Sequence, residues 1–479
     1  MTLALGLLII GLAVFLVLRG VEVRLVLAVA ALVLGVLAWD PWPVVIQFLA
    51  TMADGKFIIP ICSAMGFVYV LKQARCDEHL VHLLSKPLRR VRLLLIPGTV
   101  LVGFFVNIPI ISQTSTALVV GTVLIPLLRA GGISPLTAGA SLLLGASMGG
   151  ELLNPGAPEL LTVAKANMVA PQVCVGYVAS LLPVYVPVVI ALFWWLSRRA
   201  EKRWEQQHPV VWAPPTEAVE AERRPEPTLQ ASEVFRVNLG KAIIPLIPLI
   251  FLFLAGPPFN VVNIPASWLV SPKEVPALME VKDPDAARAQ LNQLAKKPEV
   301  FNSRLIGLAM LLGVICAALV SGKAIRQTGA AFFEGAGYGY THIISLIVAA
   351  SAFGKGVEEL GLDKTFGQLI QTFPALLIPA AAFLPWALAF ISGSGMASTN
   401  ALYGFFVEPA HALGLDPLQI GAVVSLSSGA GRTMSAVAAV TLMSSKLTET
   451  KPLDLVKRVA PPLLFGLTVV VGWLMMKGG

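Results

Sequence analysis

Residues 112–159 read SQTSTALVVGTVLIPLLRAGGISPLTAGASLLLGASMGGELLNPGAPE, and they decide the fold because a second stretch repeats their plan. Residues 392–435 read SGSGMASTNALYGFFVEPAHALGLDPLQIGAVVSLSSGAGRTMS, with Gly139 and Gly421 in matching places (421 − 139 = 282). Each copy runs from a Ser/Thr cluster through an apolar helix and a Gly-x-x-Pro turn to a Gly/Ser-rich break. Paired interruptions of hydrophobic segments indicate the binding site of a secondary transporter.

The composition is that of a polytopic membrane protein. Apolar residues make up 56% of the 479 residues and charged residues only 13%, whereas soluble domains carry roughly 25% charged residues. Apolar windows of about 17 to 25 residues, long enough to cross a bilayer, recur along almost the whole chain. The first window lacks a basic leader and a small-residue cleavage site, so we interpret it as a retained span and not a signal peptide.

We predict an all-α polytopic fold of two inverted repeats, each with about five transmembrane helices, one of them broken, and one re-entrant hairpin. A Pro/Glu/Arg-rich linker at residues 198–238 joins the repeats and is predicted to be cytoplasmic and disordered. The predicted parts are the first repeat 1–197 with hairpin 93–128 and broken span 135–170, and the second repeat 239–479 with outer loop 257–303, hairpin 373–413 and broken span 417–446. The other spans are predicted at 2–18, 25–39, 56–71, 173–196, 241–256, 305–321, 331–353 and 459–476.

Loop charge predicts the orientation. The net charge of +8 comes from Lys and Arg beside the spans, which is an orientation signal and not a nucleic-acid footprint. Placing these residues in the cytoplasm requires the N-terminus outside and hairpins that return to the side they came from. The arm 72–92 is basic whereas its counterpart 355–371 is not, as expected for inverted halves, although two unrelated surface helices are the alternative. We therefore predict a multi-pass protein of the bacterial inner membrane.

The hairpin turns and breaks carry the polar groups of the predicted site. Hydroxyl, amide and free carbonyl oxygens at membrane depth suit Na⁺ or a substrate carboxylate, although Ser and Thr can also bond back to helical carbonyls. The predicted substrate-binding residues are Ser112, Gln113, Thr114, Ser115, Asn154, Ser398, Thr399, Asn400, Arg432 and Thr433. The predicted coupling-ion or proton residues are Ser147, Gly149, Glu151, Ser394 and Gly429.

Arg432 is the most informative residue of the site. It is the only Lys or Arg between Lys364 and Lys446, and a charged group inside a membrane costs at least ~2.5 kcal/mol unless it is paired or hydrated. Its forked donors suit a substrate carboxylate, and the alternative is a structural ion pair with Glu151 in the matching break. Three roles stay open for Glu151: a proton-coupling acid, a partner of Arg432 or a helix cap. Glu159 is interpreted as an acid at a helix start, where it suits the dipole.

On the motifs SQTSTALVVGTVLIPLL, GISPLTAGASLLLGASMGGELLNPGAPE, SGSGMASTNA and SGAGRTMS, the chain resembles the DcuC family of anaerobic four-carbon dicarboxylate carriers, in the ion transporter superfamily. The resemblance spans essentially the whole chain. It implies transport of succinate, fumarate or related dicarboxylates by a homodimer with a fixed scaffold and an elevator-like transport domain. Related sodium/dicarboxylate carriers show Ser-Asn-Thr at both tips, whereas residues 112–114 read Ser-Gln-Thr and 398–400 read Ser-Thr-Asn, so Na⁺ and H⁺ coupling both stay open.

The predicted function is secondary active transport of small organic dianions, by ion symport or substrate exchange. One Arg fixes one carboxylate, so a carrier or exporter of another carboxylate or an amino-acid derivative is the alternative, and a channel on the same re-entrant loops is a further one. No Ser-His pairing or Ser-x-x-Lys motif appears in the breaks, so we expect no enzyme. The expected partners are the dicarboxylate, the lipid bilayer and a second copy of the chain, with no cofactor and no nucleic acid.

Overall fold

The computed structural model describes residues 2–207, 235–271 and 299–477. Every regular element within these ranges is helical, which confirms the predicted all-α class. Eight helical segments in the same ranges are long and apolar enough to cross a membrane. The chain is therefore a multi-pass membrane protein.

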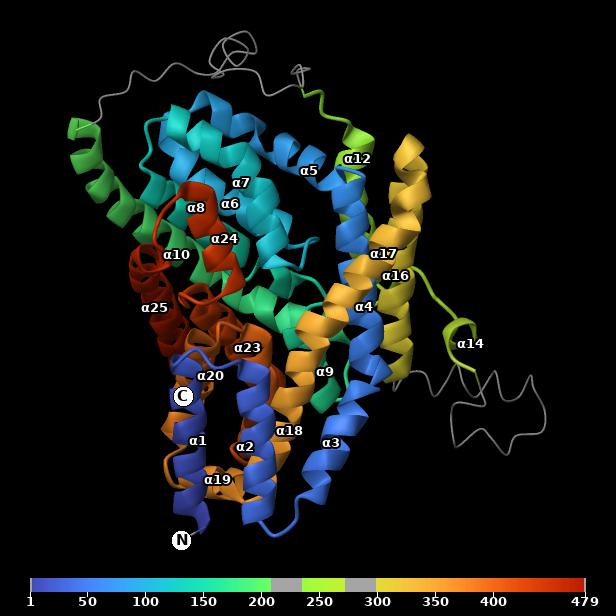
Figure 1. The fold of residues 1–479 in the computed structure, drawn as a ribbon, viewed down its shortest axis with the longest axis vertical. Helices are drawn as coiled ribbons and strands as arrows, with labels where there is room; N and C mark the ends of the chain where they lie inside the picture. Colours follow the sequence, from blue (N-terminus) through green and yellow to red (C-terminus); the bar gives the residue numbers. More distant parts are fainter. Residues whose placement is uncertain (1, 208–234, 272–298, 478–479) are drawn as a thin grey trace.

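The first half of the chain runs from α1 to α10 and contains one helical hairpin, α6–α7, and one interrupted helix, α8–α9 (Figure 1). A short 3-10 turn, η3 (Gly150–Leu153), lies in the interruption. The helices are α1 (Thr2–Leu18), α2 (Val23–Leu37), α3 (Trp42–Met52), α4 (Gly55–Gln73), α5 (Cys76–Ser85), α6 (Leu95–Asn107), α7 (Gln113–Ala130), α8 (Pro135–Ser147), α9 (Pro158–Ala166) and α10 (Pro171–Gln207).

The second half follows the same order with shorter pieces. A π-helical turn (Gly339–Ile344) joins α17 to α18, and the second hairpin is built from α20 and the pair α21–α22. The helices are α12 (Leu239–Ile243), α13 (Ile247–Ala255), α14 (Ala266–Leu269), α16 (Glu299–Val320), α17 (Thr328–Tyr338), α18 (Ser345–Glu359), α19 (Leu362–Thr372), α20 (Leu377–Ser392), α21 (Gly395–Leu402), α22 (Gly404–Ala412), α23 (Pro417–Thr433), α24 (Ala439–Thr448) and α25 (Pro452–Lys477).

Two segments correct the prediction. The helix α3 was missed because its 11 residues are too short to span a bilayer. The linker predicted at 198–238 does not begin at 198, because α10 continues through its Arg-, Glu-, Lys- and Gln-rich end to Gln207, and these residue types are strong helix formers. The rest of the predicted linker at 208–234, and residues 272–298 of the predicted outer loop, lie outside the described residues.

The repeated motifs begin their helices in the same way in both halves. The Ser134 side chain accepts a hydrogen bond from the amide of Thr137, and Pro135 takes the first position of α8. The Asp416 side chain accepts from the amide of Leu418, and Pro417 starts α23. Ser and Asp are preferred helix N-caps, and proline needs no amide partner in the first turn. Each Gly-x-x-Pro turn is thus the start of the helix that leads into a break.

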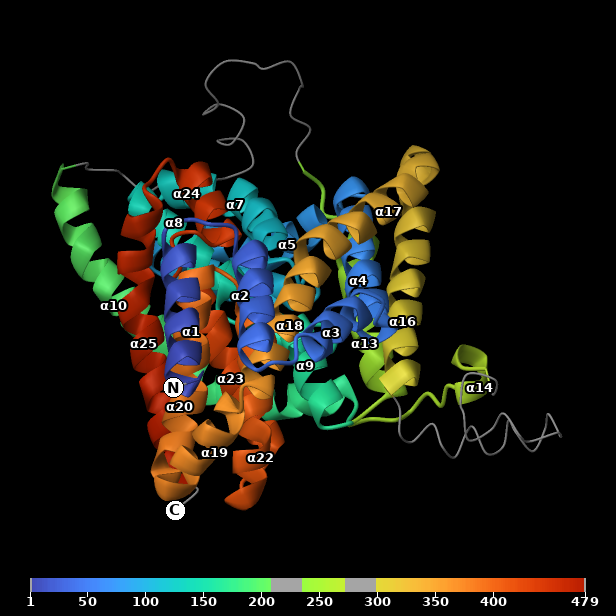
Figure 2. The same cartoon turned by 60° about the horizontal axis from the view of Figure 1, so that its bottom comes forward.

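The two halves exchange packing partners in a reciprocal way. Helix α4 packs against α16 and α17, whereas α18 packs against α2 and α3. Helix α7 of the first hairpin packs against α24, and α21 of the second hairpin packs against α9. In both views α7 lies in the upper part of the molecule and α20 in the lower part (Figures 1 and 2). One helix of each hairpin therefore lies on a different side of the middle of the molecule in these views.

Candidate functional site

The interrupted helices of the two halves meet at their breaks. Helix α8 ends at Ser147, and Gly149 takes a left-handed conformation (φ 113°) before the η3 turn. The hydroxyl of Thr433, at the end of α23, lies 2.7 Å from the Ser147 hydroxyl and 2.8 Å from the Ser147 carbonyl oxygen. It also lies 2.8 Å from the carbonyl oxygen of Gly429. These contacts hold the end of α23 against the end of α8.

Three charged side chains are buried where the breaks meet. Arg432 Nη2 forms an ion pair with Glu151, and Arg432 Nη1 lies 3.3 Å from Glu159 Oε1. The exposed fraction is 6% for Arg432, 0% for Glu151 and 2% for Glu159. Among the residues that the structure describes, Arg432 is the only buried Lys or Arg. The ion pair with Glu151, one of the two interpretations of Arg432, is present, and a role of Arg432 in substrate binding stays a prediction.

This charged cluster keeps unused hydrogen-bonding capacity. Within the described ranges, neither Glu151 Oε2 nor Arg432 Nε has a hydrogen-bond partner. Unsatisfied buried polar atoms are rare in native proteins and call for a specific explanation, such as a strained or functional site. Arg432 can therefore still donate a hydrogen bond through Nε while both of its terminal nitrogens are occupied.

The tip of the first hairpin joins the cluster directly. Gln113 Nε2 donates to Glu151 Oε1 at 3.0 Å. Asn107 Oδ1, at the end of α6, accepts from the Glu151 amide at 3.1 Å. The other predicted residues of this tip are half-buried: Ser112, which caps α7, Thr114 and Ser115. The first hairpin thus holds the Glu151 side of the cluster through an amide on each of its two helices.

The second hairpin covers the cluster with backbone. Ser394 caps α21, and Gly395 is the first residue of that helix. A Cβ atom added at Gly395 would lie 3.1 Å from Glu159 Oε1 and 3.2 Å from Arg432 Nη1. Both distances are tighter than ordinary contacts, so a side chain fits here only if the ion pair shifts.

The predicted triplet at residues 398–400 is bonded to neighbouring helices and not to the charged cluster. The hydroxyls of Ser398 and Thr399 donate to α20 and α23. Asn400 Nδ2 donates to Ser351 Oγ of α18 at 2.8 Å. The structure thus separates Asn400 from Arg432, although both belong to the predicted substrate-binding set.

The side chain of Asn154 forms hydrogen bonds to backbone groups close to the first break. Its Nδ2 donates to the Ile108 carbonyl at 2.9 Å, and its Oδ1 accepts from the Gly156 amide at 2.9 Å. These bonds attach the segment between η3 and α9 to the tip of the first hairpin. Among the described contacts of Asn154, none reaches Arg432.

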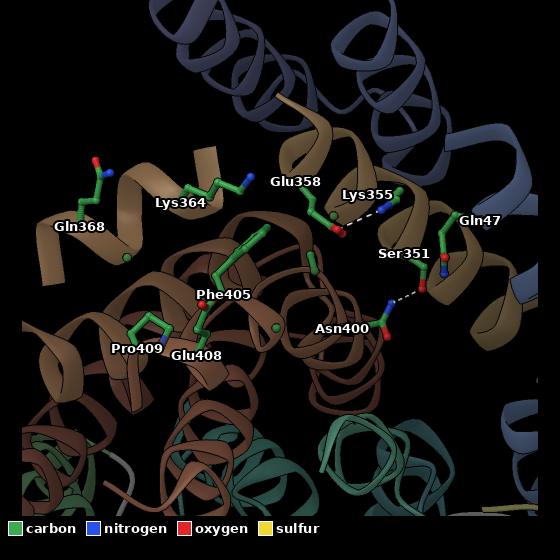
Figure 3. Close-up of a pocket in the computed structure, with 14 residues that line it drawn as sticks. Gln47, Ser351, Lys355, Glu358, Lys364, Gln368, Asn400, Phe405, Glu408 and Pro409 are labelled. Carbon is green, nitrogen blue, oxygen red and sulfur yellow. Dashed lines mark hydrogen bonds and ion pairs between the residues drawn. The ribbon is translucent and has the colours of Figure 1, made fainter. Parts of the chain in front are cut away.

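A cavity of about 600 Å³ lies between the second hairpin, α18 and α19 (Figure 3). Asn400 lines it, and Asn400 Oδ1 lies 3.4 Å from Thr162 Oγ1 on α9. Thr162 follows Glu159 by one turn of α9. The wall of the cavity is therefore connected to the helix turn that carries Glu159. Other lining residues are Gln47, Lys355, Glu358, Lys364, Gln368, Phe405 and Glu408.

The described residues hold no group of three or more His, Cys, Asp or Glu side chains that could bind a metal ion. Sodium would instead use hydroxyl and carbonyl oxygens at the hairpin turns and breaks. The structure places Ser147, Thr433 and Gly429 together there, and coupling to Na⁺ stays a prediction.

Sequence reasoning missed Glu159 as a member of the charged cluster. Glu159 does lie in the first turn of α9, where the helix dipole already explains an acid. The same turn faces α23, so the carboxylate also reaches Arg432. The available signal was a second acid eight residues after Glu151 (159 − 151 = 8) in an apolar break, because buried acids need a cation or a proton.

The fold and the site define a multi-pass membrane protein with two hairpins and two broken helices around a buried charged cluster, an arrangement typical of secondary carriers. A family profile described as "DcuC: C4-dicarboxylate anaerobic carrier" matches residues 48–478. The chain belongs to the DcuC family, as its motifs predicted. This is a family of transporters and not of enzymes.

The names of similar proteins are consistent with this family. An uncharacterized transporter of Haemophilus influenzae is 41% identical over 126 residues, which are 26% of this chain and 87% of that protein. The "Probable anaerobic C4-dicarboxylate transporter DcuC" of Vibrio cholerae is 23% identical over 444 residues, 90% of this chain and 84% of the relative. The "Anaerobic C4-dicarboxylate transporter DcuC" of Escherichia coli K12 is 26% identical over 142 residues, 29% of this chain and 31% of the relative.

Proposed function

We propose that this protein is a secondary active transporter of C4-dicarboxylates such as succinate, fumarate and malate. The observation that carries the proposal is Arg432, buried where both breaks and both hairpin tips converge, with an unused donor at Nε. A planar guanidinium binds a carboxylate through two parallel hydrogen bonds. The family description and the names of the Vibrio and Escherichia relatives support the four-carbon dicarboxylate as the substrate class.

We propose alternating access between two inverted repeats as the transport mechanism. The packing of α4 against α16 and α17 is mirrored by that of α18 against α2 and α3, and the packing of α7 against α24 by that of α21 against α9, which supports this symmetry. The moving unit would comprise α6–α9 and α20–α24, against a scaffold of α1–α4 and α16–α18, as in an elevator. The side-chain contacts that cross between these units include those of Asn400 with Ser351 and the Ile347 carbonyl and that of Lys165 with Asp54, and they must break during the movement.

The proposed orientation places the N-terminus outside, in the bacterial inner membrane. Helix α5, which is flanked by Arg75 and by the basic turn η1 (Lys86–Arg90), and the charged end of α10 lie at the end of the molecule opposite the N-terminus (Figure 1). This supports a common cytoplasmic side for them. The re-entrant character of both hairpins follows from this orientation. We also propose a homodimer, to be tested by native mass spectrometry of the protein in lipid nanodiscs.

The test of the proposed function is uptake of radiolabelled succinate by proteoliposomes. Unlabelled fumarate and malate are expected to compete, whereas lactate and glutamate are not, and preloaded succinate is expected to drive saturable counterflow. Competition by a monocarboxylate alone would favour the alternative carboxylate carrier, and linear, non-saturating flux would favour a channel. Replacing the Na⁺ gradient by an H⁺ gradient separates the two symport modes, and indifference to both indicates exchange.

A further inference from the structure

The charged cluster contains more acid than base. Glu151 and Glu159 both approach one guanidinium, that of Arg432, and all three side chains are buried. If both carboxylates were ionised, the cluster would bury one uncompensated negative charge, which is costly in a low-dielectric interior. Two carboxylates that share one cation relieve this conflict when one of them takes up a proton, so the cluster with both acids ionised is ready to bind one.

Hydrogen bonding distinguishes the two carboxyl groups. Glu151 Oε1 accepts from Arg432 and from Gln113, and the amide of Glu151 is fixed by Asn107. Glu159 has the longer contact, 3.3 Å from Arg432 Nη1. Donors favour the ionised form of a carboxylate. Glu151 is therefore the better site for the negative charge, and Glu159 the better site for a proton.

The wall of the cavity contacts the turn of α9 that carries Glu159. Asn400 lines the cavity (Figure 3), and its Oδ1 lies 3.4 Å from Thr162 Oγ1. The Thr162 hydroxyl donates to the Pro158 carbonyl at 3.1 Å, on the turn of α9 that carries Glu159. On the other side Gly395 closes the ion pair with backbone only. A movement of the second hairpin would thus uncover Glu159 and Arg432 together.

We propose that Glu159 is the proton-binding group of this transporter, and that its protonation releases Arg432 Nη1 to a substrate carboxylate. The inference rests on the proposed transport of dicarboxylates. When the second hairpin uncovers it, the Glu159 carboxylate takes one proton from water and becomes a carboxylic acid, and the freed guanidinium N–H binds the incoming carboxylate. When the substrate leaves, Glu159 gives the proton to the opposite compartment and pairs with Arg432 again. One proton moves with each dicarboxylate.

The other charged groups near α9 leave this assignment intact. Helix α23 contributes Arg432 and η3 contributes Glu151, both already in the cluster. Helix α4, which also packs against α9, carries Asp54 at its N-cap and Lys56 in its first turn. Asp54 forms an ion pair with Lys165 at 2.7 Å. Lys165 lies on α9 six residues after Glu159 (165 − 159 = 6). Helix α21 approaches Glu159 with Gly395. Tyr185 of α10 is a buried, uncharged side chain within electrostatic reach of Glu151.

The decisive experiment counts protons per succinate in weakly buffered proteoliposomes that contain a pH-sensitive dye. The wild type is expected to move about one proton with each succinate. Glu159→Gln keeps the shape of the side chain but cannot titrate, so its ratio should fall to near zero for whatever flux remains. The matched control is Glu201→Gln, another buried carboxylate, which caps α8 outside the cluster, and its ratio should equal that of the wild type. An unchanged ratio in Glu159→Gln would overturn the proposal.

A second measurement needs no substrate, so it separates this proposal from the transport function. Infrared difference spectra between low and high pH, recorded on the protein in nanodiscs, should show a carboxylic acid band that is missing in Glu159→Gln and present in Glu201→Gln. If Glu159→Gln does not fold, Glu159→Asp is expected to shift the pH at which the band disappears. A band that neither variant changes refutes Glu159 as the proton site, whether or not succinate is transported.

Discussion

The two breaks have the same plan and opposite charge. The break after α8 supplies Glu151 and Glu159, whereas the break after α23 supplies Arg432, at the place that corresponds to Gly150 in the first copy. The helix starts, the glycine density and the reciprocal packing are shared. The repeat thus provides the geometry of the site twice, and the charges that differ between the copies provide its chemistry.

The strongest test of this comparison removes the single positive charge. Arg432→Ala leaves Glu151 and Glu159 buried without a cation, and breaking a buried ion pair costs about 3–5 kcal/mol. We expect a large loss of thermal stability in detergent and no succinate uptake. Adding Glu151→Gln and Glu159→Gln removes the unpaired charges, so the triple variant should recover stability but not transport. Wild-type uptake by Arg432→Ala would remove Arg432 from the site.

A milder change keeps the positive charge at residue 432 and removes the planar guanidinium. Arg432→Lys retains a cation for Glu151 but loses the forked donors that reach Glu159 and a substrate carboxylate. Charge-assisted hydrogen bonds are worth about 1.5–3 kcal/mol, so uptake should fall roughly ten- to hundredfold at low succinate concentration. Concentration-dependent uptake measures this effect. An unchanged KM would mean that the fork does not contact the substrate.

The two hairpin tips differ in what they contact, and paired variants sharpen that difference. Gln113→Ala removes a bond to Glu151, so the KM for succinate should rise roughly five- to thirtyfold, as about 1–2 kcal/mol predicts. Asn400→Ala removes bonds to α18, so it should change the maximal rate by roughly two- to fivefold, as about 0.5–1 kcal/mol predicts. Equal effects on KM in the two variants would contradict the separate placements of Gln113 and Asn400.

The smallest effect is expected at the edge of the first break. Lys165 pairs with Asp54 at 2.7 Å, but their side chains are 36% and 18% exposed. Pairs open to solvent are worth about 0–1 kcal/mol, so Lys165→Met should change stability by less than about 1 kcal/mol. Thermal unfolding followed at low and high salt measures this, and a drop as large as that of Arg432→Ala would show that Lys165 belongs to the charged cluster.

The sequence predicted the features that depend on local pattern. Apolar windows and the Gly-x-x-Pro turns identify the long helices and the starts of α8 and α23, because capping and burial act within a few residues. The alignment of the two breaks also put Glu151 opposite Arg432 as one alternative. Features that depend on tertiary contact were not visible. Asn400 turns toward α18 and Glu159 toward α23, and no spacing along a single helix encodes such choices.

The separation of the charged partners along the chain has a consequence for biosynthesis. Glu159 and Arg432 are 273 residues apart, and Glu151 and Arg432 are 281 apart. At about 5–20 residues per second, a ribosome needs roughly 15 to 55 s to make the chain between Glu159 and Arg432. During that time the first half carries two acids of the charged cluster without their cation, and a charged group inside a membrane is costly unless it is paired or hydrated. The ion pair can therefore form only after most of the chain has been made, and a chain that stops between the two halves lacks the cation of the charged cluster.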